Sequence, residues 1–181
     1  MSDVSALPPD LPVPEDDGAC DGLVGQAIPS LVFQSSQGPV DLAEWAGERL
    51  VLYVDPRAGR TERPGWDAIP GACGCTPQAC AFRDHAGELN GLGARVAGLS
   101  AQSLDEQVRF AERNHLPFPI LSDEGLRLRD ALGLPTFEAD EDVLYKRVMI
   151  VAERAAVVKV FYPVFPPDRN AAEVMAWLEA R

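Results

Sequence analysis

The chain has 181 residues, of which 46% are hydrophobic and 24% are charged, a composition that excludes a wholly disordered protein and suits one domain with an extension. Its 28 acidic and 16 basic residues give a formal net charge of −12, which repels DNA and RNA and argues against a nucleic-acid partner. No apolar run approaches the about 18 residues of a membrane-spanning helix, so we expect no membrane partner either.

The N-terminal segment differs in composition from the rest of the chain. Prolines recur between positions 8 and 14, and two aspartates follow at 16 and 17. Such a stretch cannot build its own core, so we expect residues 1–22 to form a flexible, Pro-rich acidic arm and residues 23–181 to form the folded domain. Residues 1–5 have neither the basic residues nor the apolar run of a signal peptide, which favours a cytoplasmic protein.

The remaining elements follow one another in α/β order. Apolar residues around a turn at 37–39 predict a hairpin of 31–33 and 40–42, and the unbroken apolar run 49–54 predicts a central strand. The apolar patterns also predict helices over 76–92 (with Thr76 as cap), 104–115, 125–132 and 171–180, and strands over 94–100, 118–121, 146–151 and 157–162. This order predicts a mixed central sheet with helices on both faces, which fits the thioredoxin-like fold.

A long loop, residues 55–74, separates the strand 49–54 from the next helix. It is rich in proline and glycine. Loops of this length are uncommon in compact domains and often carry function. Trp66 either lines a pocket there or packs the loop down. The apolar segment 161–167 is expected to pack against the domain, with a lid over the site or a contact surface for a partner as alternatives.

The cysteines are clustered. Three of the four, Cys73, Cys75 and Cys80, lie within eight residues, and such a cluster in a reducing compartment indicates catalysis or metal binding. Cys75 is expected at a helix N-terminus, where free N–H groups and the helix dipole favour an anion. We therefore expect a lowered pKa and a nucleophilic thiolate at Cys75. The alternative is a small buried residue at a helix start.

Cys80 follows five residues later. An intact α-helix places such Cα atoms about 8–9 Å apart, whereas a disulfide needs about 4.4–6.8 Å. A bond between Cys75 and Cys80 therefore requires the first turns of the helix to unwind. The alternative is that Cys80 is a core residue beside Phe82.

The segment 74–84 resembles the active-site helix of the peroxiredoxins, and it is most similar to the bacterioferritin-comigratory-protein, or Q-type, subfamily. The resemblance spans about residues 23–180 and includes 116–123 and 146–151. It implies a thiol peroxidase without a cofactor, in which Cys75 reduces hydrogen peroxide or an organic hydroperoxide and becomes a sulfenic acid. It also implies Cys80 as the resolving cysteine of an intramolecular disulfide, Arg147 as the cation beside the thiolate, and a thioredoxin-like reductant.

The chain departs from the family pattern before the reactive cysteine. The family places a proline, three residues, a Thr or Ser, two residues and then this cysteine. Pro56 matches the proline, but residues 57–74 separate it from Cys75. Ala72 stands three residues before Cys75 and has no hydroxyl, and Thr61 or Thr76 could replace it only through an unusual loop path. We expect peroxide to be bound by Pro56 and by backbone N–H groups at Gly74, Cys75 and Thr76.

The other cysteines leave alternatives open. Cys73 could be a spectator, an auxiliary redox thiol that pairs with Cys75, or a metal ligand. We expect no metal, because His85 and His115 have no ligand-like spacing with the cysteines. Cys20 lies among acidic residues that raise a thiol pKa, so we expect it to be a spectator.

Two other functions compete with the peroxidase. One is a general thiol–disulfide oxidoreductase, which the missing Cys-x-x-Cys spacing weakens. The other is a thioredoxin-fold metal-binding module that uses Cys73, Cys75 and Cys80. We expect a monomer, with a dimer as the alternative.

Overall fold

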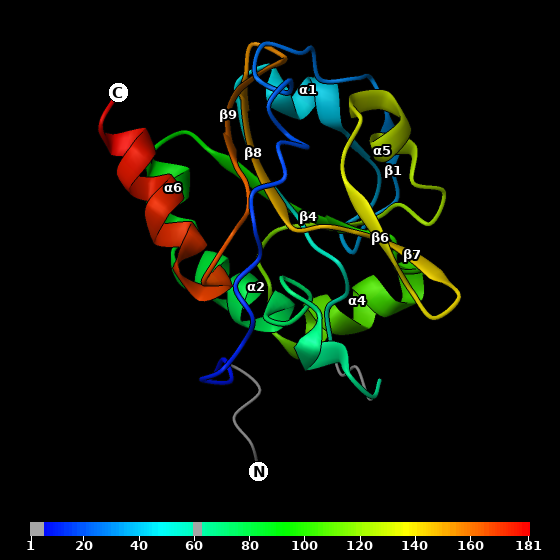
Figure 1. Cartoon of the computed structure of the whole chain (residues 1–181). Coiled ribbons are helices and arrows are strands. Elements are labelled where there is room, and N and C mark those ends of the chain that lie inside the picture. The colour runs from blue at the N-terminus through cyan, green and yellow to red at the C-terminus, as the bar shows by residue number, and fades with distance from the viewer. Residues whose placement is uncertain (1–5, 60–62) are drawn as a thin grey trace.

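A five-stranded sheet forms the centre of the computed structural model, which describes residues 6–59 and 63–181 (Figure 1). Its strand order is β5-β4-β3-β8-β9. The strands are β3 (Arg49–Val54), β4 (Arg95–Ser100), β5 (Ile120–Ser122), β8 (Val148–Glu153) and β9 (Ala156–Phe161). β3, β4 and β5 pair in parallel, while β8 and β9 pair antiparallel, so the sheet is mixed, as the sequence predicts.

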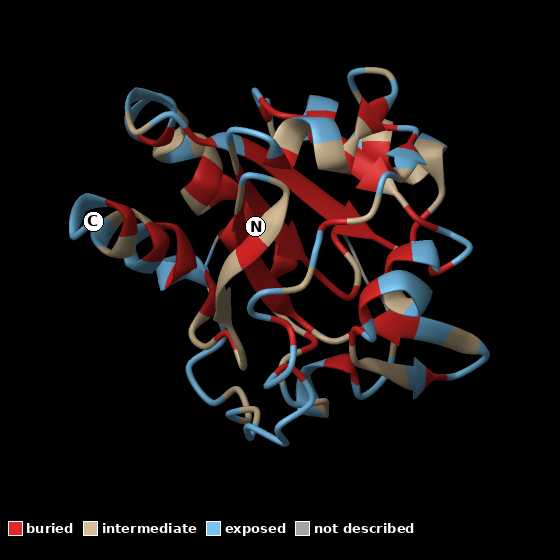
Figure 2. Cartoon of the chain, turned by 90° about the horizontal axis from the view of Figure 1, so that it is seen from above, coloured by how far each residue is buried: buried red, intermediate tan, exposed pale blue. Residues whose placement is uncertain are grey.

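Helices cover both faces of this sheet, because a strand sends alternate side chains to opposite sides. Leu50 and Leu52 of β3 join one buried cluster, and Val51 and Tyr53 join the other. The first cluster includes α1 (Leu42–Ala46) and α5 (Arg127–Leu132); the second includes α2 (Cys75–Asp84), α3 (Ala86–Gly91), α4 (Leu104–Arg113) and α6 (Asn170–Glu179). Figure 2 shows the sheet as a buried layer between them. The predicted two-sided arrangement is confirmed.

The predicted helix over 76–92 is wrong at its start and in its middle. The helix starts at Cys75, and its N-cap is Gly74 rather than Thr76. Gly74 has a φ of 104°, a left-handed conformation that glycine adopts without a Cβ penalty. The helix also breaks at His85, which ends α2 and precedes α3.

Two hairpins lie outside the central sheet. β1 (Val32–Phe33) pairs with β2 (Val40–Asp41), which confirms the first predicted hairpin. β6 (Thr136–Ala139) pairs with β7 (Asp142–Tyr145), and the sequence did not indicate this hairpin. Only β6 alternates polar with apolar residues, and each strand has only four positions, which is too short a pattern to distinguish a strand from a loop.

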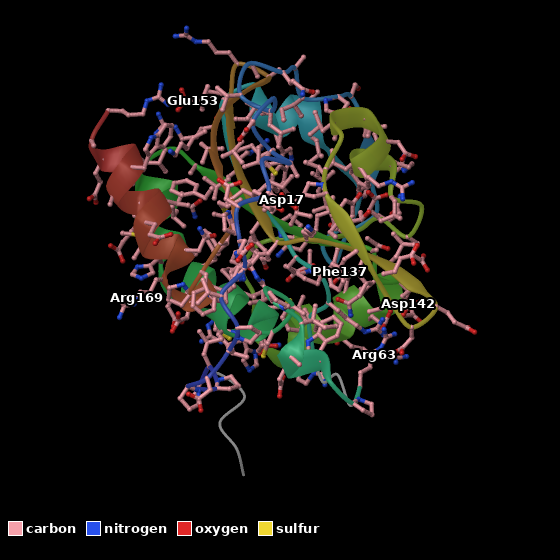
Figure 3. The ribbon with its side chains drawn as sticks, in the orientation of Figure 1. Asp17, Arg63, Phe137, Asp142, Glu153 and Arg169 are labelled. Atoms are coloured by element: carbon pink, nitrogen blue, oxygen red, sulfur yellow. The ribbon has the colours of Figure 1, made fainter. Side chains whose placement is uncertain are left out.

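The β6–β7 hairpin anchors the long loop that precedes α2. Arg63 forms an ion pair with Asp142 and donates to the Ala139 carbonyl at 3.2 Å. Trp66, in the short helix η1 (Trp66–Ala68), packs its ring 6.3 Å from that of Phe137. Arg63, Phe137 and Asp142 lie on the same side of the molecule in Figure 3. Trp66 therefore holds the loop against the domain.

The described part of the N-terminal segment lies along the outside of the domain. In Figure 1 it passes in front of the sheet and runs towards α2. Asp17 accepts hydrogen bonds from Lys146 at 2.7 Å and from the Tyr162 hydroxyl at 2.8 Å, and these bonds hold the pKa of Asp17 down to about 2. In residues 6–59 and 63–181, no helix is long and apolar enough to cross a membrane.

Candidate active site

The sulfur of Cys75 lies beside a buried guanidinium. Cys75 is the first residue of α2 and is only 4% exposed. Arg147, which directly precedes β8, places its Nη2 3.2 Å from the Cys75 sulfur. The same nitrogen donates to the carbonyls of residues 71–73 at 3.1–3.3 Å. One side chain thus contacts the thiol and also holds the last turn of the loop.

Two polar residues fix the position of Arg147. Its Nη1 donates to Gln78 Oε1 at 2.5 Å, and Gln78 Nε2 donates to Asn170 Oδ1 at 3.0 Å. Gln78 and Asn170 are completely buried. Sequence reasoning missed both residues. A polar residue at an inward-facing helical position could have indicated them, because a buried polar side chain needs a hydrogen-bond partner.

The electrostatics of Cys75 contradict one expectation. Burial raises the pKa of the Cys75 thiol to about 12, and the Arg147 guanidinium opposes that rise only in part. The predicted lowering of this pKa is wrong for the described conformation. The helix start and one cation do not offset the loss of water around the sulfur.

Asp55 is a second functional candidate that sequence reasoning missed. It directly follows β3 and is 3% exposed. Burial raises the pKa of Asp55 to about 6, while Arg147 and a hydrogen bond with Cys75 oppose this rise. Its negative charge in turn raises the pKa of Cys75. Asp55 could have been found in the sequence as an acidic residue placed directly after a run of apolar residues.

A small cavity of about 100 Å³ reaches Cys75. Gly74 and Thr76, which the sequence indicates as candidate peroxide-binding residues, line it, and so do Trp66 and Leu7. A water molecule takes about 30 Å³ of liquid, so the cavity has room for a small peroxide. Pro56 is buried but does not line this cavity, and Thr61 lies outside the described residues.

Cys80 faces another part of the structure. Its sulfur lies 3.8 Å from Asn114 Oδ1. Burial raises the pKa of Cys80, and Arg83 opposes the rise. Both Cys75 and Cys80 belong to the continuous helix α2. Helix geometry therefore separates their Cα atoms by about 8–9 Å, too far for a disulfide while the helix is intact.

Cys73 and Cys20 occupy different surroundings. Cys73 is half-buried and lines the same cavity as Cys75; burial raises its pKa, and Asp67 adds to the rise. Cys20 is buried in the core cluster that includes α1 and α5. Burial is the main cause that raises the pKa of Cys20 to about 12, with its acidic neighbours contributing. Across residues 6–59 and 63–181, no group of three His, Cys, Asp or Glu side chains could hold a metal ion.

Gly74 leads to a testable prediction on stability. A Cβ there would overlap Pro167 Cγ and lie 2.9 Å from Leu7 Cδ2, at a positive φ. We expect Gly74→Ala to lower the free energy of unfolding by about 2–4 kcal/mol, from backbone strain and overpacking together. Gly93→Ala is the matched control, because its φ is 74° and a Cβ there meets nothing within 4 Å. Urea denaturation of both variants tests this, and equal losses would contradict it.

Comparisons with known proteins agree on one family. The Redoxin family model matches residues 23–175. The chain is 32% identical to peroxiredoxin Q of Sedum lineare, with 86% of this chain and 77% of that protein covered. It is 33% identical to peroxiredoxin Q of Populus jackii, covering 86% and 68%. Both relatives are named as chloroplastic.

The fold is also similar to that of solved structures. The crystal structure of peroxidoxin BcpB from Mycobacterium tuberculosis matches with a TM-score of 0.71 and 26% identity, covering 87% of this chain and 96% of that one. This similarity confirms the thioredoxin-like fold.

Proposed function

Because the chain belongs to the Redoxin family and, within it, to the Q-type peroxiredoxins, it is a thiol peroxidase, and we propose that Cys75 is its peroxidatic cysteine. The observation that carries this assignment is the 3.2 Å contact between Arg147 Nη2 and the Cys75 sulfur. It occurs at the start of a helix and beside a cavity. A cation and converging N–H groups stabilise a thiolate and the charge that develops on the peroxide oxygen.

The first step consumes one peroxide. The Cys75 thiolate attacks one oxygen of the O–O bond, which breaks and releases an alcohol or, from hydrogen peroxide, water once the leaving oxygen takes a proton. The sulfur is oxidised to sulfenic acid and the peroxide is reduced. Gly74 and Thr76 are the proposed peroxide-binding residues, through their backbone N–H groups.

The second step forms a disulfide. We assign Cys80 as the resolving cysteine: its thiol attacks the Cys75 sulfenic acid, an S–S bond forms, and water leaves. Because α2 separates the two sulfurs, its first turns must unwind for this step. A thioredoxin-like dithiol protein then reduces the disulfide by exchange.

Other properties remain predictions. The proposed enzyme acts as a monomer, with a dimer as the alternative, in the cytoplasm. Neither competing function has support in the described residues: Cys75 and Cys80 lack the spacing of a dithiol oxidoreductase, and no metal-ligand cluster is found there.

The direct test combines turnover with chemical mapping. With hydrogen peroxide, a thioredoxin-type dithiol protein, its reductase and NADPH, we expect peroxide-dependent NADPH oxidation. Without reductant, peptide mass spectrometry of oxidised protein should find Cys75 linked to Cys80. A protein that consumes no peroxide, and whose Cys75 stays reduced, would overturn the proposed function.

A further inference from the structure

Cys73 and Cys75 line the same cavity, whereas Cys80 does not. We propose that Cys73 is a second resolving cysteine, which forms a Cys73–Cys75 disulfide without any unwinding of α2. This inference rests on the proposed peroxidase function of Cys75. It adds a route for the second step of the cycle.

The chain geometry permits this bond. Two peptide units span at most about 6.6–7.2 Å between Cα atoms when fully extended, and a disulfide requires about 4.4–6.8 Å. Gly74, between the two cysteines, has φ 104° and ψ 13°, which is a turn rather than an extended conformation. The Cα atoms of Cys73 and Cys75 are therefore closer than this limit, within the range of a disulfide.

Cys73 and Cys75 line the cavity through which peroxide reaches Cys75. Cys73 therefore has access to the oxidised Cys75 sulfur, which it attacks from the side opposite the S–O bond that breaks. Arg147 Nη2 donates both to the Cys73 carbonyl at 3.1 Å and to the Cys75 sulfur at 3.2 Å. One side chain thus holds the two residues in a fixed relation while Cys75 reacts.

The Cys73 thiol loses its proton in the resolving step. Asp67 lines the cavity with Cys73, and its negative charge adds to the rise in the pKa of Cys73. In the proposed step the Cys73 thiolate attacks the Cys75 sulfur, an S–S bond forms and the S–O bond breaks. The hydroxyl leaves as water with the proton from Cys73, which is oxidised while the Cys75 sulfur is reduced.

The competing route through Cys80 has to break a buried network. Unwinding the first turn of α2 breaks the bond from Gln78 N–H to the Gly74 carbonyl, 3.0 Å, and displaces the Gln78 side chain from Arg147 and Asn170. Cys80 must also leave its contact with Asn114. The Cys73 route needs none of these changes.

The test oxidises cysteine variants with one equivalent of hydrogen peroxide, followed by dimedone trapping and peptide mapping. In Cys80→Ser we expect a Cys73–Cys75 disulfide, and turnover with a thioredoxin-type reductant within about tenfold of the wild type. In Cys73→Ser/Cys80→Ser we expect dimedone-labelled Cys75 and turnover lower by about 100-fold or more. Cys80→Ala repeats the Cys80→Ser experiment without placing a new hydroxyl group in the buried site.

The outcomes separate the two proposals. If Cys80→Ser and Cys80→Ala accumulate dimedone-labelled Cys75 and form no Cys73–Cys75 bond, the role of Cys73 is overturned while the peroxidase assignment stands. If wild-type Cys75 is never oxidised by peroxide, the proposed function fails and this inference fails with it.

Discussion

Replacing Cys75 by serine lowers peroxide turnover by at least about 1,000-fold, because a serine oxygen is far more basic than sulfur and cannot be oxidised to a sulfenic acid. Serine fits the site, since a hydroxyl can accept the hydrogen bond from Arg147 that the sulfur now accepts. The loss would therefore be chemical rather than structural. Peroxide consumption and dimedone labelling, measured on the same preparations, check this result.

Cys20→Ala is the matched control for that experiment. Cys20 is as buried as Cys75, but it packs in the cluster on the other face of the sheet. Its removal should leave turnover at the wild-type level. If Cys75→Ser kept more than about a tenth of the wild-type rate, another thiol would carry the reaction and the assignment of Cys75 would be wrong.

Local patterns in the sequence are sufficient to find the candidate active-site segment and much of the fold. The run Arg49–Val54 is an unbroken apolar strand in both prediction and structure, because a central strand is buried on both faces. Cys75 is recognisable from its place at the end of a glycine-rich loop, and Arg147 from the family resemblance. The structure brings these two residues into contact although they lie far apart in the chain.

The features that the sequence did not reveal are properties of the packed chain. Asp55, Gln78 and Asn170 come from three distant segments and act through contacts with Cys75, with Arg147 or with one another. The raised pKa of Cys75 likewise depends on how completely the loop and helix remove its sulfur from water. Its position at a helix N-terminus, taken alone, predicts a lowered pKa for Cys75.

Arg147 is the second residue whose replacement should have a large effect on the peroxide reaction, because its charge acts on the Cys75 sulfur. The guanidinium is the strongest influence that lowers the pKa of Cys75, against burial and the Asp55 carboxylate, which raise it. Arg147→Ala should therefore raise this pKa further. Each unit by which the pKa rises leaves about tenfold less thiolate at neutral pH. We therefore expect sulfenic acid formation at pH 7 to slow by about 10- to 100-fold.

The pH profile distinguishes this electrostatic role from a merely structural one. Below the pKa of Cys75 the thiolate fraction rises about tenfold per pH unit, so the rate constant with peroxide rises with pH and the Arg147→Ala profile is displaced to higher pH. Asp55→Asn removes an opposing charge and should displace the profile to lower pH. Arg147→Lys keeps the charge but loses the fork that binds Gln78 and the loop carbonyls, so we expect an intermediate rate.

Arg95→Ala is the control for loss of an arginine, because Arg95 is exposed and stacks on Trp45, away from the cavity. Stopped-flow measurement of the peroxide reaction from pH 6 to 9 gives the profiles of the wild type and of the four variants. An Arg147→Ala profile that coincides with the wild type would mean that the guanidinium holds the loop without affecting the thiol. Only the helix N-terminus and the cavity would then be left to promote the reaction of Cys75. In this conformation they cannot stabilise the thiolate sufficiently, because burial of the sulfur raises its pKa.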